Sequence, residues 1–294
     1  MAHSDLRAAQ RDLAGAEARL AEGVAVLRRG LALAPRDLGL RRALGSTLVR
    51  LGGLHRQQDR AELAQRAWEE ALALRRDLAA EDENPSSRRD VLVLLSRLAE
   101  LRQAGGDPAG ARQALEEVLV AQRELGGEPG ATPGARRDLA VALLKAGDAR
   151  QAAGEAEPAC AVYAEAVTLL AELAASDRSD VAGQRELFAG AQRLLQASVA
   201  LRRLDQALEA AEHLLSAARA AAAAQGDAPA PRRDVSIALL KRADVRQARG
   251  EREAALADLR AAVENHRALV PDAPRYAPEL ERMEAMLAAY AAGE

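Results

Sequence analysis

The chain has little of several residue types, and each shortage argues against a class of protein. A single cysteine, Cys160, stands among 294 residues, so neither an intrachain disulfide nor a cysteine-rich metal site is available. Aromatic residues make up 2%, which leaves few rings for stacking nucleic-acid bases. The 41 Lys and Arg residues are matched by 44 Asp and Glu residues. Without a basic excess, we expect no nucleic-acid partner.

Long apolar segments are missing as well. The first residues, MAHSDLRAAQRD, are charged and lack the apolar core of a secretory signal. The longest apolar run, AMLAAYAA at 285–292, is far shorter than the ~20 residues of a membrane-spanning helix. We therefore expect a cytoplasmic protein without a membrane partner.

What the chain does have is an internal repeat. The tetrad Arg88-Arg89-Asp90-Val91 recurs at 136–139 and again at 232–235, which is 48 and then 96 residues further on. A related tetrad, Gln-Arg-Glu-Leu at 184–187, stands where the missing copy belongs. Proline- and glycine-containing stretches recur with the same period. Self-similarity at a fixed period of this size indicates a repeat architecture.

Between these stretches the apolar residues follow a helical period. From Val235 to Val263 they form a broad stripe with a spacing near 3.6, interrupted at Gly250. Ala, Leu, Arg and Glu dominate, and no stretch alternates as a strand does. The pattern therefore predicts that each unit consists of a helix, a tight turn and a second helix. One such hairpin cannot bury its own apolar face, whereas stacked hairpins share a continuous core.

The predicted fold is thus all-α, a single α-solenoid over residues 1–294. We expect thirteen helices, with the first hairpin made of Ser4–Ala16 and Glu17–Ala34. The hairpins are predicted near 4–35, 37–80, 86–128, 134–176, 182–226 and 230–270, with a capping helix at 277–292.

Each hairpin resembles the tetratricopeptide repeat (TPR), which has small residues at fixed positions, a glycine at the turn and one bulky residue. In the fourth hairpin these are Gly147, Gly154, Ala159, Tyr163 and Ala166. The third and sixth hairpins follow the pattern closely. The second has Asp59 at the turn, and the fifth departs most, with Leu195, Arg202 and Ala211. Since the common TPR period is about 34 residues, these units resemble a lengthened bacterial form, with helices of roughly 19 residues.

The resemblance implies a right-handed superhelix whose first helices line a concave groove. Basic residues recur at one position of these helices, followed by acidic residues three positions later and glutamines three positions after that. The groove candidates are Arg50, Arg97, Lys145, Arg193, Lys241, Glu100, Asp148, Asp244, Gln103, Gln151 and Gln247. By that similarity, the basic column receives a carboxylate or an acidic peptide, and the glutamines bond an extended backbone. The alternative is that neighbouring charges, such as Lys145 and Asp148, only neutralise one another.

The Arg-Arg-Asp tetrads favour a structural role. They open the first helix of each hairpin, where Asp suits the positive end of the helix dipole and arginine does not. We therefore expect the arginines to pair with acidic residues of a neighbouring second helix or loop.

Residues for catalysis or metal binding do not converge. Phosphate-loop, metalloprotease and serine-hydrolase motifs are absent. The histidines His3, His55, His213 and His266 are scattered at no ligand spacing, so we expect them at the surface or partly packed. Cys160 is predicted to be a buried, inert thiol. We expect no enzyme activity, no cofactor and no metal.

The leading functional hypothesis is a scaffold that binds a partner protein or peptide in the groove, in bacterial signalling or defence. The alternative is a self-assembling structural module that forms homo-oligomers. The alanine-rich stretch 214–224 offers a smooth surface for such self-association. An enzyme with an unrecognised site is a third hypothesis.

Overall fold

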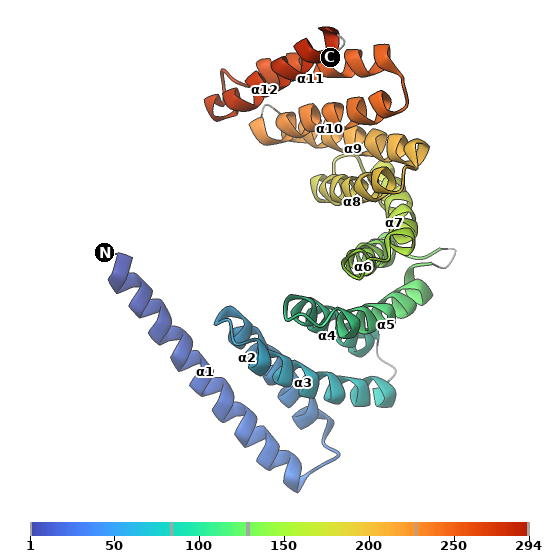
Figure 1. The fold of residues 1–294 in the computed structure, drawn as a ribbon. Coiled ribbons are helices and arrows are strands. Elements are labelled where there is room, and N and C mark those ends of the chain that lie inside the picture. Colours follow the sequence, from blue (N-terminus) through green and yellow to red (C-terminus); the bar gives the residue numbers. More distant parts are fainter. Residues whose placement is uncertain (1, 83–84, 128–129, 227, 293–294) are drawn as a thin grey trace. The chain divides into compact units, whose positions relative to one another are not determined.

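In the part that the structure describes, the chain consists of helices joined by short connections (Figure 1). The computed structural model describes residues 2–82, 85–127, 130–226 and 228–292, with the backbone alone for 2–12, 82, 85 and 86. Over these ranges no strand is present, and the predicted all-α fold is confirmed. The His3 side chain and parts of three predicted loops, at 83–84, 128–129 and 227, lie outside the described residues.

Most helices are about twenty residues long and begin at regular intervals. The helices starting at Pro85, Pro133, Val181, Pro229 and Ala277 follow one another every 48 residues. The described chain contains α1 (Ala2–Leu33), α2 (Leu38–Gln57), α3 (Ala61–Asp82), α4 (Pro85–Ala104), α5 (Pro108–Gly126), α6 (Pro133–Ala152), α7 (Ala156–Ser176), α8 (Val181–Ala200), α9 (Leu204–Gln225), α10 (Pro229–Ala248), α11 (Arg252–Arg267), a 3-10 turn (Pro274–Tyr276) and α12 (Ala277–Ala292). We call α2, α4, α6, α8 and α10 the A helices, and α3, α5, α7, α9 and α11 the B helices.

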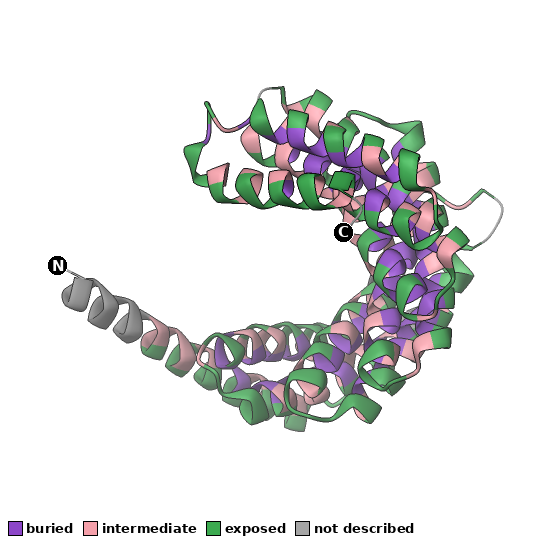
Figure 2. Cartoon of the chain, turned by 45° about the horizontal axis from the view of Figure 1, so that its top comes forward, coloured by how far each residue is buried: buried purple, intermediate pink, exposed green. Residues whose placement is uncertain are grey.

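The helices form two compact units, residues 1–121 and 122–294. In the first unit, α1 packs on α2, α2 on α3 and α3 on α4. In the second unit, each helix from α6 to α12 packs on the next. Buried residues run along the middle of these packed helices (Figure 2). That all 294 residues form one continuous solenoid stays a prediction.

The predicted first hairpin is wrong, because α1 is a single helix. Gly15 stands at the expected turn, but the residues after it are strong helix formers and no proline interrupts them. The described chain therefore has twelve α-helices where the sequence predicted thirteen. The second half of α1 takes the place of a B helix: Arg28 pairs with Glu70 of α3 at 2.6 Å.

Small and bulky residues meet across the A–B hairpins as the repeat pattern predicts. A Cβ atom added at Gly147 would lie 2.3 Å from the Tyr163 ring, and one at Gly52 would lie 2.4 Å from the Trp68 ring. Both rings are almost fully buried. Only glycine lets the A helix approach the ring of its own B helix this closely.

One residue in the left-handed conformation ends each described A helix. The φ angle is 81° at Gly106, 79° at Gly154 and 81° at Gly250. Two hairpins use other residues: φ is 56° at Asp59 and 57° at Arg202. This conformation lets the N–H of that residue and the N–H of the following residue donate to free carbonyls of the last helical turn, as Gly154 and Glu155 do to Gln151 and Arg150.

The Arg-Arg-Asp tetrads make structural pairs, as expected from their place in the sequence. Arg137 pairs with Asp180 in the loop before α8 and with Glu186 of α8, at 3.1 Å in the second case. The Gly183 N–H and then the Arg137 guanidinium hold the pKa of the Asp180 carboxyl below its ordinary value. Arg136 pairs with Glu172 of its own hairpin's B helix, not of the neighbouring one as predicted. Arg137 therefore ties consecutive hairpins together, and Arg136 ties the two helices of its own hairpin.

Helix α7 is the one described helix that is long and apolar enough, by length and composition alone, to cross a membrane. Half of its most apolar window is buried inside the fold. Its three glutamates pair with other parts of the chain: Glu157 with Arg203, Glu165 with Arg123 and Glu172 with Arg136. Packing between α6 and α8 accounts for its apolar composition.

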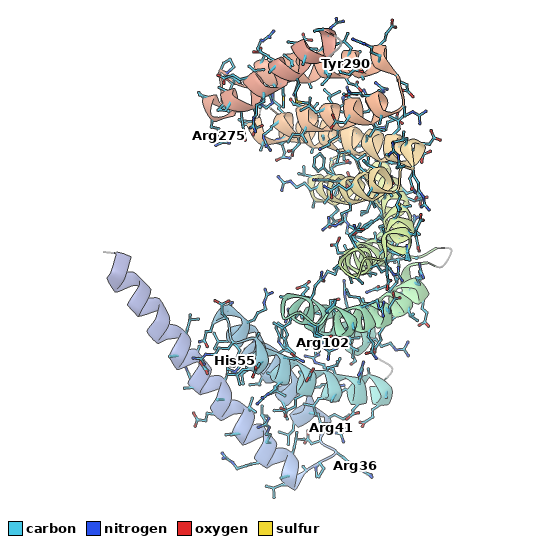
Figure 3. The ribbon with its side chains drawn as sticks, viewed as in Figure 1. Arg36, Arg41, His55, Arg102, Arg275 and Tyr290 are labelled. Carbon is cyan, nitrogen blue, oxygen red and sulfur yellow. The ribbon has the colours of Figure 1, made fainter. Side chains whose placement is uncertain are left out.

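Two histidines are more buried than expected. His266 is completely buried between α11 and the C-terminal segment, where its Nε2 lies 3.3 Å from the Tyr276 carbonyl oxygen. His55 is buried on α2, and its Nδ1 lies 3.9 Å from a Glu17 carboxylate oxygen of α1 (Figure 3). Both rings fill space under a terminal helix. Cys160 is buried as predicted, beside Ser198 and Gln206.

Candidate functional site

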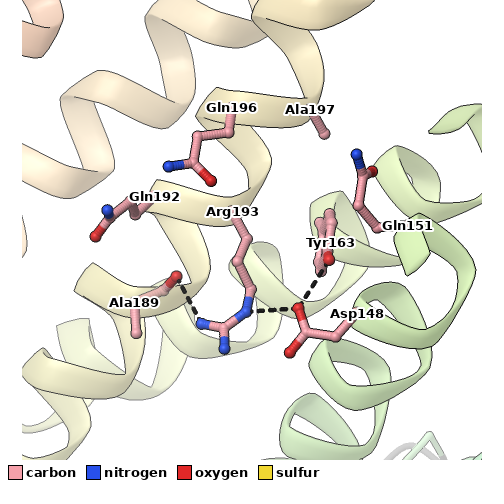
Figure 4. Close-up of a pocket in the computed structure, with 8 residues that line it drawn as sticks. All are labelled: Asp148, Gln151, Tyr163, Ala189, Gln192, Arg193, Gln196 and Ala197. Carbon is pink, nitrogen blue, oxygen red and sulfur yellow. Dashed lines mark hydrogen bonds and ion pairs between the residues drawn. The ribbon is translucent and has the colours of Figure 1, made fainter. Parts of the chain in front are cut away.

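Two adjoining cavities lie along the A helices of the second unit, with volumes of about 450 and 330 Å³. They share Gln192 and Gln196 of α8, and we call the two cavities together the A-helix groove. The first cavity is lined by Asp148, Gln151, Tyr163, Ala189, Gln192, Arg193, Gln196 and Ala197 (Figure 4). The second is lined by Gln192, Leu195, Gln196, Val199, Ala200, Leu204, Lys241, Asp244, Val245 and Ala248.

A charged cluster fixes the geometry of the first cavity. The Arg193 Nε donates to Asp148 Oδ1 at 2.8 Å, and its Nη1 donates to the Ala189 carbonyl at 3.2 Å. The Tyr163 hydroxyl donates to the same Asp148 oxygen at 2.8 Å (Figure 4). Asp148 thus pairs with Arg193 of the next A helix. That Lys145 on its own helix also neutralises Asp148 stays a prediction.

The electrostatics of this cluster favour a fixed ion pair. The hydrogen bond to Asp148 raises the pKa of the Arg193 guanidinium, so the arginine stays charged. Burial, and then the hydrogen bond to Asp148, raise the pKa of Tyr163, so its hydroxyl stays neutral. Because a guanidinium carries five N–H donors and two are engaged here, Arg193 keeps donors for a ligand.

Three amide side chains surround this cluster. Gln151, Gln192 and Gln196 are all exposed, and none of them makes a hydrogen bond with another described residue. A glutamine amide both donates and accepts hydrogen bonds, as a peptide group does. The first cavity therefore suits a ligand with backbone-like polar groups and a negative charge.

The second cavity is more apolar. Its lining includes buried Leu195 and Val245, and Val199 with 47% of its surface exposed. Lys241 and Asp244 of α10 also line it. The groove thus has a polar, charged half and a more apolar half that contains two charged residues.

The structure brings together five of the eleven predicted groove residues: Asp148, Gln151, Arg193, Lys241 and Asp244. Lys145 and Gln247 lie on the same helices but outside both cavities. Arg50, Arg97, Glu100 and Gln103 belong to the first unit, where the Arg97 guanidinium lies 6.0 Å from the centre of the Trp68 ring. A binding role for all eleven residues stays a prediction.

Sequence reasoning missed Gln192 and Tyr163 as groove residues. The residues equivalent to Gln192 in other A helices are Ser96, Leu144 and Leu240, so no repeated column marks this position. A usable signal was the four-residue spacing between Gln192 and Gln196, which places both on one helix face. Among the described residues, no group of three or more His, Cys, Asp or Glu side chains is placed to hold a metal ion.

Comparison with known proteins supports the repeat and the fold. Residues 141–173 match the family model described as tetratricopeptide repeat. No curated protein sequence matches the chain. Three similar solved structures are BtubC (BKLC) from P. vanneervenii, a Podosopora anserina putative kinesin light chain with nearly identical TPR-like repeats, and the apo form of RapI.

The three structures share the fold of this chain but little of its sequence. For BtubC the TM-score is 0.58 at 20% identity, covering 87% of this chain and 92% of that one. For the kinesin light chain repeats it is 0.53 at 21%, covering 78% and 96%, and for RapI 0.54 at 11%, covering 83% and 77%. At such identities the similarity concerns the fold. Residues 141–173 thus match the tetratricopeptide repeat model, and the chain that contains them has a TPR-like fold of helix hairpins.

Proposed function

We propose that this chain is a non-catalytic scaffold that binds an extended segment of a partner protein in the A-helix groove. This proposal rests on one observation: three unpaired glutamine amides surround a guanidinium held by Asp148, and the apolar lining of the second cavity adjoins them. Polar groups of this kind set orientation in protein binding sites, and apolar surface supplies most of the affinity.

The groove suggests how each part of such a segment is received. A carboxylate of the ligand lies against the free donors of Arg193. Gln151, Gln192 and Gln196 exchange hydrogen bonds with the ligand backbone, and an apolar side chain of the ligand covers Val199 and Leu195. Lys241 and Asp244 at the far rim select against ligands with the wrong charge.

Selection from a displayed library of random twelve-residue peptides tests this proposal. The selected peptide is then titrated calorimetrically into the protein and into the Gln192→Ala/Gln196→Ala variant. Loss of two hydrogen bonds is expected to weaken binding roughly tenfold. Gln113→Ala is the matched control, since Gln113 is an exposed glutamine of α5 outside both cavities. Equal affinity for all three proteins, or no selected peptide, contradicts the proposal.

Self-assembly is the alternative that the sequence raised. Much of the alanine-rich stretch 214–224 serves the fold itself, because Leu214, Leu215, Ala217, Ala218 and Ala221 are buried. Light scattering across a concentration series tests this alternative, and a monomer at every concentration removes it. A bacterial and cytoplasmic setting also stays a prediction from the sequence.

A further inference from the structure

A series of ion pairs joins successive helices on the B-helix side. Each pair links an arginine of one helix to a glutamate of the next B helix, with N–O distances of 2.6 Å. The pairs are Arg28–Glu70 between α1 and α3, Arg76–Glu117 between α3 and α5, and Arg123–Glu165 between α5 and α7.

The series stops between α7 and α9. One period after Arg123 and Glu165 stand Ala171 and His213, which cannot form the pair. The next arginine, Arg219 of α9, has no glutamate to meet either, because position 261 is alanine. The arginine–glutamate pair is therefore missing twice in the second unit, first between α7 and α9 and again between α9 and α11.

A cavity of about 900 Å³ opens at Ala171 and His213, where the pair between α7 and α9 is missing. It shares no lining residue with the A-helix groove, and we call it the B-helix groove. It is lined by Ala171, Ala174, Ala175, Arg178, Ser179, Gln184, Leu187, Glu212, His213, Leu215, Ser216, Arg219, Ala220, Ala223, Ala224 and Arg242.

The B-helix groove is lined by more positive than negative side chains. Arg178 and Arg219 line it, and within the described chain neither has a carboxylate partner. Arg242 is already held by Asp258 at 2.6 Å. Glu212 is the one acidic residue among the lining residues. The groove therefore complements a negatively charged surface.

The walls are shaped to admit a helix. Alanines occupy positions 171, 174 and 175 of α7 and positions 220, 223 and 224 of α9, which is the i, i+3, i+4 spacing of one helix face. Buried Leu187 and Leu215 lie among the lining residues. Small side chains on both walls let a third helix approach closely, and its apolar face would cover these leucines.

We propose that the B-helix groove docks an acidic amphipathic helix of a partner protein. The carboxylates of that helix take the role that glutamates play in the rest of the ion-pair series, against Arg178 and Arg219. Its small apolar face packs on the alanines. This site is separate from the A-helix groove and goes beyond the function proposed for it.

A designed helical peptide tests the proposal. The probe has Ala and Leu at i, i+3, i+4 and i+7 on one face, with Glu on both flanks. A second peptide carries Lys in place of every Glu. Binding is measured by fluorescence anisotropy at low and at physiological salt. We expect the Glu peptide to bind at least about tenfold more tightly than the Lys peptide, and to weaken as salt rises.

Variants locate the binding. Arg178→Gln/Arg219→Gln is expected to lower the affinity for the Glu peptide at least about tenfold. Ala171→Arg/His213→Glu rebuilds the missing ion pair across the groove. It is expected to abolish binding and to raise the thermal midpoint. Glu117→Gln, which removes a pair in the first unit, and Gln192→Ala/Gln196→Ala in the A-helix groove leave binding unchanged.

Three results overturn the proposal. The first is equal binding of the Glu and Lys peptides. The second is unchanged affinity of the Glu peptide for both groove variants, each shown to be folded by its circular dichroism. The third is absence of peptide binding together with binding to phosphatidylserine vesicles that the same variants abolish, which assigns the groove to a membrane surface.

Discussion

The hairpins α6–α7 and α8–α9 stand next to each other and reach the same backbone geometry with different residues. In α6–α7, Gly147 faces the Tyr163 ring; at the equivalent positions of α8–α9 stand Leu195 and Ala211. All four residues are buried. The bulky residue has moved from the B helix to the A helix, and the small residue has moved the opposite way.

The turns differ in the same manner. Gly154 ends one A helix and Arg202 the other, yet both have φ between 57° and 79°. The Glu155 N–H donates to the Arg150 carbonyl at 2.9 Å, and the Arg203 N–H donates to the Ser198 carbonyl at 2.8 Å. The fold therefore depends on the summed volume across the hairpin and on one turn conformation, not on a particular residue at each position.

The largest effect is expected for Leu195→Ala. Since Ala211 opposite is already small, the change leaves a cavity and destabilises the protein by roughly 3 kcal/mol. Chemical denaturation measures this. Leu195→Ala/Ala211→Leu moves the volume back to the B helix and is expected to recover a large part of the loss. If the double variant loses as much stability as the two single variants together, the volume argument is wrong.

Gly147→Ala comes next. Its new methyl group meets the Tyr163 ring, and overpacking costs about 2 kcal/mol. Gly147→Ala/Tyr163→Leu reproduces the Ala99 and Leu115 combination of the α4–α5 hairpin. We expect denaturation curves to show positive coupling between the two changes. A double variant less stable than the sum of the single variants contradicts the account.

A smaller effect of opposite sign is expected at the turn of α8–α9. Arg202→Gly relieves a left-handed conformation and is expected to stabilise the protein by about 0.5 kcal/mol after the entropy of the added glycine is counted. Gly154→Ala, the matched change in α6–α7, is expected to destabilise by about 1 kcal/mol. Thermal melting of both variants gives the comparison, and equal signs would refute it.

The last difference between the two hairpins is the pH dependence of stability, because Tyr163 can ionise at alkaline pH and Ala211 cannot. The pKa of Tyr163 is higher in the folded protein than in the unfolded chain. The unfolded chain therefore loses this proton at a lower pH than the native protein does. Tyr163 therefore contributes stability that is complete below its unfolded pKa, near 10, and is lost as pH rises above it. Tyr163→Phe is expected to flatten stability against pH in this range. An unchanged slope would show that Tyr163 does not titrate late.

How far the sequence predicted the molecule follows from these contacts. The 48-residue period placed the A and B helices from α2 to α11 and the terminal α12. Gly147 with Tyr163 revealed the close hairpin contact, because both signals are local and repeated. The continuous α1 was not predicted, since helix formers on both sides of Gly15 outweigh a weak break.

The candidate sites were only partly predictable. Asp148 and Arg193 appeared as members of two columns, but their pairing joins α6 to α8 and depends on how those helices pack. Gln192 and the B-helix groove arise where the repeat is broken. A search for repeated columns misses such places, because they are defined by a departure from the pattern.

The peptide-binding role of the A-helix groove is tested most directly by nuclear magnetic resonance of glutamine side-chain amides during titration with a selected peptide. The account predicts saturable shifts for Gln151, Gln192 and Gln196, with the Gln113 signal unchanged. Saturation of the peptide without any shift of these three amides would contradict it.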